Sequence, residues 1–479
     1  MRLYKKEGDV IQLISFPDEQ VEKGDYLLIE DKKSQKGMIV QVIDIQFANI
    51  PGMLEDILRD VMTEESIQGE DYDPFNVSSQ ITVLKDTRLI ICKIRGMMDN
   101  GRVSSTVSHL PSRISSKISR FPIETLIEPR IKSRPIQFGT TKSQTELTLD
   151  AKVLDGRLNI ITGKKGTGKS HLSKLLVLGL VDNKAPCIVL DVNGEYVNLA
   201  KTKSGTQETQ RKIRVLTPGA NMKLTLPQIG LRTLLGVLLF ALDLPGNSAR
   251  VFSGIWRQLQ DRNELTLSSL GTAIHAYNCH ESVRDAIISR YNTIVESGMF
   301  TDNPKEAFDL DKTAQELSEG GALIINMKNQ FSTMRRMTVE ILLSKLTDLL
   351  MSWKMKAVFF FAEEAHLYLR ETYWEDIVTR MRHIGIFTTF ITNQPDTIKD
   401  SIYRQADNIF LFNFMNENDL DTVSKAAKID GESVKLIARD LPPHHCLIIG
   451  EAVKNFPLVV NIHPLNVETM GETRFFFKD

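Results

Sequence analysis

Short apolar runs alternate with helical segments in the part of the chain that follows residue 150. Each run has the length of a strand and is apolar on both faces, as strands buried inside a parallel sheet are. Strands separated by helices build an α/β core, in which helices cover a mostly parallel sheet. The runs are LNIITG (158–163), CIVLDV (187–192), KIRVLTP (212–218), GALIINM (321–327), AVFFFAEE (357–364), FTTFITNQ (387–394) and NIFLFNF (408–414).

Other patterns flank and interrupt this core. Near the start, runs rich in β-branched residues predict a small β-barrel, with a helical insertion at PGMLEDILRDVMTEESI (51–67). Between residues 225 and 318, successive helical segments without strands predict an inserted helical subdomain. The predicted boundaries are 1–110 for the barrel, 111–150 for a connector and the start of the core, 151–224 and 319–465 for the two parts of the core, 225–318 for the helical subdomain and 466–479 for an apolar, aromatic tail.

Composition sets only broad limits. A formal net charge of −1 does not by itself indicate a nucleic-acid binder, although a balanced chain can carry a local basic channel. The start, MRLYKKEGDVIQ, has no apolar leader, and the longest apolar run, LLGVLLFAL (234–242), is too short to span a bilayer. We therefore expect a soluble, cytoplasmic protein without a membrane segment. No CxxC spacing, and so no zinc site or disulfide framework, is found among Cys92, Cys187, Cys279 and Cys446.

The octapeptide GKKGTGKS (163–170) lies between a predicted strand and a predicted helix. It matches GxxxxGK[ST] in full, and in this context glycines let backbone N–H groups surround a phosphate at a helix N-terminus. Lys169 would reach the β- and γ-phosphate oxygens, and Ser170 would supply a hydroxyl to Mg²⁺. ATP and Mg²⁺ are the expected cofactors. The expected nucleotide-binding residues are Gly163, Lys164, Lys165, Gly166, Thr167, Gly168, Lys169, Ser170 and His171.

Two adjacent acids end the apolar run AVFFFAEE. A P-loop enzyme needs an acid at the end of a neighbouring strand to hold Mg²⁺ through water, and an ATPase often has a second acid that polarises the attacking water. We assign Glu363 to the metal and Glu364 to the base. Two acids favour hydrolysis over the simple phosphoryl transfer of a kinase. The alternative interpretation is that the two acids have no catalytic role and lie in solvent at the end of the strand.

Two further strand ends carry polar candidates. Asp191, in LDVNGEY (190–196), could position water or contact the γ-phosphate, or it could instead stabilise a tight Asx-type turn. Asn393, in FTTFITNQPDTI (387–398), could sense the γ-phosphate, or it could belong to the turn before Pro395.

Arginines near the core strands could complete the site. Arg380 and Arg382 end the helical segment before the Asn393 strand, and an arginine from a neighbouring subunit can stabilise charge on the transferred phosphoryl group. We assign this role to Arg382, with helix C-terminal capping as the alternative. Arg157, just before the P-loop strand, is a further candidate for nucleotide contact.

These motifs together resemble the HerA branch of the HerA–FtsK ATPases. The resemblance is carried by the P-loop, LDVNGEY, FFFAEEAH (359–366), RMRHIGIFTTFITNQPDTI (380–398) and LPPHHCLIIGEAVKNFPLVV (441–460), in this order. The predicted N-terminal barrel also looks like the barrel of that branch. By resemblance, Lys169 and Ser170 are the P-loop pair, Asp191 is the acid after the second strand, Glu363 and Glu364 form the acid pair, and Arg382 is the finger.

The resemblance implies a RecA-like P-loop ATPase core and a homohexameric ring, with a heptamer possible for the free protein. It implies ATP hydrolysis coupled to translocation of double-stranded DNA through a central pore, as a DNA helicase does. It also implies a partner nuclease of the NurA type, for DNA end resection and repair. Two departures are Thr392-Asn393-Gln394-Pro395, where the family often has Ser-Gln-Arg-Pro, and the pair Lys164-Lys165 in the P-loop.

A DNA-translocating ring needs basic residues that face its pore and contact phosphates. The segment KTKSGTQETQRKIR (201–214) and the basic connector at 113–134 are the candidates, and a solvated surface loop is the alternative for the first. The candidate contacts in the first segment are Lys201, Lys203, Arg211, Lys212 and Arg214.

Three other functions remain open at this stage. The same ATPase could serve an antiviral defence complex with another effector, or ATP could order a scaffold ring that does not translocate. A small-molecule kinase is the third, and the acid pair with the candidate trans arginine disfavours it.

Overall fold

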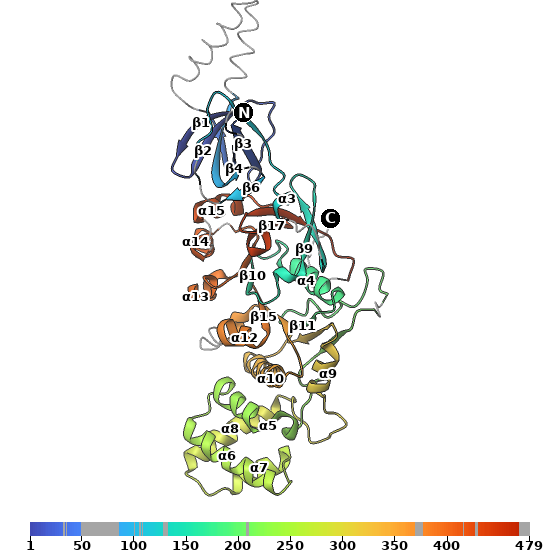
Figure 1. The fold of residues 1–479 in the computed structure, drawn as a ribbon. Coiled ribbons are helices and arrows are strands. Elements are labelled where there is room, and N and C mark those ends of the chain that lie inside the picture. The colour runs from blue at the N-terminus through green and yellow to red at the C-terminus, as the bar shows by residue number, and fades with distance from the viewer. Residues whose placement is uncertain are drawn as a thin grey trace, which may run out of the picture.

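The computed structural model describes residues 1–31, 34, 36–48, 86–99, 101–104, 107, 109–127, 133–206, 210–368, 377–414, 416–426 and 430–468. The helical insertion expected at 51–67 lies outside these residues. Figure 1 shows an elongated chain, with an N-terminal sheet at one end, a large sheet in the middle and a helical subdomain at the opposite end. No helix among the described residues is long and apolar enough to cross a membrane.

The large sheet has eleven strands in the order β12-β13-β11-β14-β15-β10-β16-β17-β18-β8-β9. The first seven of this order are parallel, as the apolar runs predict. Their bounds are β12 (Ile213–Leu216), β13 (Gly321–Asn326), β11 (Pro186–Asp191), β14 (Val358–Glu363), β15 (Ile386–Thr392), β10 (Asn159–Thr162) and β16 (Asn408–Leu411).

Helices cover both faces of the parallel part, and alternate strand residues enter two separate cores. In β14, Phe360 and Ala362 join one core, whereas Phe359 and Phe361 join the other. The first core includes α10 (Ser332–Met351), and the second includes α4 (Lys169–Asp182). Burial on both faces explains why these strands are apolar throughout rather than alternating. The doubly covered sheet confirms the predicted α/β core.

Four antiparallel strands extend the sheet beyond β16. The predicted runs at 446–453 and 457–464 supply β17 and β18, and a hairpin from the expected connector supplies β8 and β9. At Gly139, a Cβ would lie 2.1 Å from the Asn461 carbonyl, so only glycine permits this close approach of β8 to β18. The bounds are β17 (His445–Gly450), β18 (Leu458–Ile462), β8 (Pro135–Thr141) and β9 (Glu146–Asp150).

The N-terminal strands form a curved antiparallel sheet around their own apolar core. Its order runs β1-β2-β5-β4-β3-β7, and no pairing among the described residues joins β1 to β7, so the predicted barrel is an open half-barrel. The expected connector supplies β7. The bounds are β1 (Arg2–Glu7), β2 (Val10–Ser15), β3 (Tyr26–Asp31), β4 (Lys36–Phe47), β5 (Arg88–Asp99), β6 (Arg102–Ser104), which pairs with β5, and β7 (Ser116–Arg120).

Helices between β12 and β13 form a subdomain with a third apolar core, which the first half of α10 completes. Trp256 and Phe252 are buried there, with ring centroids 6.2 Å apart. Figure 1 shows α5 to α8 grouped at the end of the molecule away from the half-barrel. The bounds are α5 (Leu226–Gly236), η2 (Val237–Ala241), α6 (Gly246–Asp261), α7 (Leu267–Ala276) and α8 (Glu281–Glu296).

The remaining elements are short. They are α3 (Glu124–Ile127), η1 (Ala151–Val153), α9 (Leu310–Leu317), η3 (Ala365–Leu367), η4 (Ile377–Met381), α12 (Arg382–Ile384), η5 (Pro395–Thr397), α13 (Asp400–Tyr403), α14 (Glu417–Ala426), α15 (Gly431–Arg439) and η6 (Glu451–Val453).

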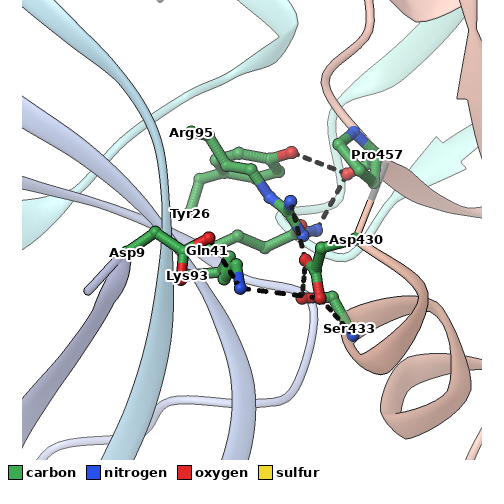
Figure 2. Close-up of polar contacts among 8 residues, drawn as sticks. All are labelled: Asp9, Tyr26, Gln41, Lys93, Arg95, Asp430, Ser433 and Pro457. Atoms are coloured by element: carbon green, nitrogen blue, oxygen red, sulfur yellow. Dashed lines mark hydrogen bonds and ion pairs between the residues drawn. The ribbon is translucent and has the colours of Figure 1, made fainter. Parts of the chain in front are cut away.

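The half-barrel is tied to the core through α15. Figure 2 shows Lys93 and Arg95 of β5 pointing toward Asp430, which caps α15 by accepting the Ser433 N–H at 3.0 Å. Arg95 Nη1 lies 3.4 Å from Asp430 Oδ2, and Lys93 Nζ lies 3.6 Å from Oδ1. Beside them, Gln41 Nε2 and Tyr26 Oη both donate to the Pro457 carbonyl at 2.8 Å.

This network predicts that Asp430→Ala costs about 3 kcal/mol of unfolding free energy, because it leaves the nearly buried Arg95 without a carboxylate, whereas Lys93 keeps its ion pair with Asp9 at 2.8 Å. Burial alone would raise the pKa of Asp430, but Ser433 and the two cations hold it below its ordinary value. The stabilisation is therefore present at neutral pH and is lost as pH falls through the folded-state pKa.

Urea unfolding measures this cost, with Asp440→Ala as the matched control. Asp440 pairs with Lys23 at 2.7 Å, but its side chain is 56% exposed, so we expect a loss below about 1 kcal/mol. Equal losses for the two variants would contradict a structural role for the Asp430 network.

Candidate nucleotide site

The phosphate-binding loop begins where β10 ends, between two parallel neighbours. Thr162, the last residue of β10, pairs with Thr392 on β15 and with Leu411 on β16. The ends of the three strands are therefore level, and the loop lies at the carboxyl edge of the sheet. Ligands bind at this edge in open α/β sheets.

Two glycines let the loop pack against the segment that follows β16. A Cβ at Gly163 would lie 2.4 Å from Phe412 Cβ, and Gly168, with φ of 119°, lies against the Phe412 ring and His444. The Lys164 N–H donates to the Asn413 carbonyl at 2.9 Å, and the His444 N–H donates to the Thr167 carbonyl at 3.0 Å. These contacts hold the loop against the segments that follow β16 and precede β17.

Lys169 is folded back over this loop. Its ammonium donates to the Lys164 carbonyl at 2.9 Å, and the residue is only 8% exposed. Burial lowers the pKa of Lys169 to about 8, against the opposing effect of Glu364, Glu363 and Glu195. A bound phosphate would supply the counter-charge that this buried amine needs.

Glu363 lies directly beside the P-loop serine. The Ser170 hydroxyl donates to Glu363 Oε1 at 3.2 Å, while Glu363 Oε2 is buried without a partner among the described residues. Burial, together with Glu195, Asp191 and Glu364, raises the pKa of Glu363 well above its ordinary value.

A hydroxyl beside an incompletely bonded carboxylate fits Mg²⁺, which keeps several waters and takes few protein ligands. No group of three or more His, Cys, Asp or Glu residues in the described part of the chain could form an all-protein cation cage. The residues present therefore fit a metal that shares its coordination with phosphates and water.

Glu364 has a strained backbone that orients it differently from Glu363. Its φ of 46° is left-handed, and its N–H donates to the Ile391 carbonyl at 2.7 Å. Glu364 Oε2 lies 3.4 Å from the Thr392 hydroxyl and 3.6 Å from His366 Nδ1. The two acids thus diverge, with Glu363 facing Ser170 and Glu364 facing the end of β15.

Asp191 stabilises a turn. Its carboxylate accepts N–H groups from Gly194, Glu195 and Tyr196 at 2.7–2.9 Å, which is the Asx-type turn left open by the sequence. Burial nevertheless raises the pKa of Asp191. A catalytic role for its occupied carboxylate stays a prediction.

Lys174, which sequence reasoning left out of the site, lies beside this turn. Lys174, 3% exposed, has its ammonium 3.7 Å from Glu195 Oε2 and 5.5 Å from the centre of the Tyr196 ring. Burial lowers the pKa of Lys174, although Glu195, Glu363 and Asp191 oppose that shift. The available signal was a lysine inside the otherwise apolar helix that follows the P-loop.

The other predicted residues divide between the two edges of the sheet. Asn393 follows Thr392 at the carboxyl edge, beside the P-loop. His171 Nε2 lies 2.7 Å from the His463 carbonyl, and Lys164 and Lys165 are exposed.

Arg157 and Arg382 lie at the amino edge, away from the P-loop of their own chain. The Arg382 Nε–H donates to the Gly156 carbonyl at 2.7 Å, and its Nη2 lies 3.1 Å from Asp407. Arg157 lies 2.5 Å from Glu451 and 3.8 Å from Asp407. Neither arginine could reach this nucleotide site except from a neighbouring subunit.

Most of the basic candidates in 201–214 have acidic neighbours. Arg211 binds Asp182 through two hydrogen bonds, Arg214 lies 2.8 Å from Glu316, and Lys212 lies 3.7 Å from Glu319. Each pair reduces the positive charge available to DNA. Lys201 and Lys203 belong to a separate turn, in which Thr202 pairs with Val467.

The fold and the loop place the chain in the class of P-loop NTPases. Residues 136–363 match the protein family described as "Helicase HerA, central domain", a span that begins in β8 and ends at Glu363. This part of the chain therefore resembles the central domain of HerA helicases. It is 22% identical over 507 aligned residues to probable helicase MJ1565 of Methanocaldococcus jannaschii, covering 97% of this chain and 91% of that protein.

Solved structures show the same fold. VirB4 of Thermoanaerobacter pseudethanolicus superposes with a TM-score of 0.50 at 13% identity, covering 71% of this chain and 99% of that one. The bacterial conjugative coupling protein TrwBdeltaN70 also has a TM-score of 0.50, at 12% identity, covering 71% and 90%.

The packing of the loop predicts that Gly163→Ala destabilises the nucleotide-free protein by roughly 2 kcal/mol more than Gly166→Ala. Both alanines would have a positive φ, but only at position 163 would the new Cβ overlap Phe412, because Gly166 has open space around it. Thermal unfolding without nucleotide compares the two variants. Equal destabilisation would show that the contact with Phe412 does not hold the loop.

Proposed function

We propose that this chain is an ATP-driven double-stranded DNA translocase or helicase that acts as a hexameric ring. The single observation that carries the proposal is the arrangement at the carboxyl edge. There, Ser170 lies 3.2 Å from the buried Glu363, and Glu364 turns toward the neighbouring strand. One acid facing the metal position and a second acid beside it suit hydrolysis better than transfer to a bound acceptor.

The residues of the chain would divide the reaction between them. Backbone N–H groups of the loop bind the phosphates, and Lys169 leaves the Lys164 carbonyl to neutralise the phosphate oxygens. Ser170 and Glu363 would hold Mg²⁺, which neutralises charge on the β- and γ-phosphates when bound. Glu364 accepts a proton from the attacking water, and Asn393 senses the terminal phosphate.

Arg382 completes the site of a neighbouring subunit in this proposal. Its position at the amino edge prevents contact with its own loop, and Asp407 and the Gly156 carbonyl hold it in a fixed orientation. A ring is the assembly in which every subunit both supplies and receives such an arginine. Arg157 would assist it from the same edge.

The DNA substrate and the partner rest on the HerA-like character of the chain and its relative described as a probable helicase. Lys201 and Lys203 would contact phosphates in the pore. A nuclease of the NurA type would use the ring in DNA end resection and repair.

Lys169→Ala should lower ATP turnover at least about a hundredfold, since it removes a positive charge from the position of the transferred phosphoryl group. Phosphate release in the presence of linear duplex DNA measures the effect. Lys354→Ala, an exposed lysine at the opposite edge, is the matched control and should retain turnover. Robust hydrolysis by Lys169→Ala would refute the assignment of the loop.

Arg382→Ala should lose turnover about a hundredfold or more while still forming rings. Glu364→Gln should bind ATP but turn it over slowly. Rings mixed from these two variants should regain turnover, because some interfaces then combine an intact Glu364 with an intact Arg382 from the neighbour. Mixed rings as inactive as the parents would show that Arg382 does not act in trans.

A further inference from the structure

The turn between β13 and α10 has an unusual combination of charge and exposure. Residues 327–336, which we name the β13–α10 turn, comprise the link 327–331 and the first five residues of α10; their sequence, MKNQFSTMRR, contains three cations and no acid. The turn starts at the carboxyl end of β13, the same edge of the sheet as the P-loop. It leads into α10, which packs against the helical subdomain.

Phe331 is the aromatic residue of this turn and is 85% exposed. It immediately precedes α10 and makes no side-chain capping hydrogen bond to the helix. Leaving a whole phenyl ring in water costs free energy, and contact with an apolar surface would recover it. The ring is therefore available to a partner outside the described part of this chain.

The three cations of the turn have no acidic partner among the described residues. Lys328, Arg335 and Arg336 form no ion pair there, in contrast with Arg211, Lys212 and Arg214. The Nε atoms of Arg335 and Arg336 are also buried without a hydrogen-bond acceptor in the described structure. The cationic charge here is thus not neutralised from within.

The other side of the turn touches the nucleotide site. The Met327 N–H donates to the Asp191 carbonyl at 2.8 Å, and a Cβ at Gly194 would lie 2.6 Å from Lys328 Cδ. The stem of Lys328 therefore lies on the Asp191 turn, whose Glu195 pairs with Lys174.

We propose that the β13–α10 turn is a DNA-contacting element for duplex DNA. Lys328, Arg335 and Arg336 bind backbone phosphates, and Phe331 packs against the sugars and base edges between them. The segment supplies three cations without an ion pair among the described residues and an exposed aromatic ring, and this combination complements a polyanion with apolar faces. The inference rests on the proposed function, and it extends that function by linking the DNA contact directly to the nucleotide site.

The test is the affinity of the full-length protein for a duplex of about 30 base pairs, measured by fluorescence anisotropy at several salt concentrations. Arg335→Gln/Arg336→Gln should weaken binding roughly tenfold and reduce the slope of log affinity against log salt by about 2 per bound protomer. Phe331→Ala should weaken binding roughly fivefold with an unchanged salt slope.

The opposite end of α10 supplies matched controls. Trp353 is also 85% exposed and is followed by Lys354 and Lys356, but it lies at the amino edge of the sheet. Trp353→Ala and Lys354→Gln/Lys356→Gln should leave DNA affinity unchanged.

Several outcomes would overturn the inference. If the native protein binds the duplex and the turn variants bind it equally well, the inference fails while the proposed function stands. Light scattering measures ring assembly of the same variants. If the turn variants no longer assemble but keep the DNA affinity of each protomer, the turn is an interface between copies of the chain. A native protein that does not bind duplex DNA would overturn both the inference and the proposed function.

Discussion

The pairing of β10 with β15 and β16 is the constraint on which the rest of the site depends. Parallel pairing on both sides levels the three strand ends, so the P-loop, Thr392 and Phe412 emerge at the same edge. Phe412 then fills the space that the absent side chain of Gly163 leaves open. The strand pairing and the contact with Phe412 therefore determine the geometry of the phosphate-binding loop.

The charges at this edge are arranged for a ligand that brings its own charge. Four carboxylates (Asp191, Glu195, Glu363 and Glu364) surround two buried lysines, Lys169 and Lys174. Burial disfavours the charged form of each lysine and of Glu363. The protein alone therefore compensates neither the positive charges of the lysines nor the negative charge of Glu363 well. A nucleotide phosphate beside Lys169 and a divalent cation beside Glu363 would relieve both penalties at once. The site is thus electrostatically suited to a metal–nucleotide complex.

Much of this could be predicted from the sequence, because the informative features were local. The strand runs and GKKGTGKS depend on residues adjacent in the chain, and the structure confirms the α/β core. The contacts of Lys174 with Glu195 could not be predicted, since they depend on how α4 packs against the Asp191 turn. The same holds for β7, β8 and β9, which lie in the segment predicted as a connector and the start of the core and become strands through pairing with distant partners. Pairing of Arg211 with Asp182 is also a tertiary contact that composition does not reveal.

A series of contacts through α15 connects the half-barrel to the nucleotide site. α15 is held at its start by Arg95 and Lys93 through Asp430, and just after its end by Lys23 through Asp440. Asn413 donates to the Arg439 and Leu441 carbonyls at the same end of α15, and its own carbonyl accepts the Lys164 N–H of the P-loop. A change in the loop could reach the half-barrel through these few contacts.

The proposed function requires that ATP hydrolysis at this site moves the protein along duplex DNA. Displacement of a third strand from a triplex-containing duplex detects such movement without requiring separation of the duplex strands. We expect displacement with ATP and Mg²⁺ and none with a non-hydrolysable analogue. ATP hydrolysis that proceeds on the same DNA without any displacement would show that the protein is not a translocase.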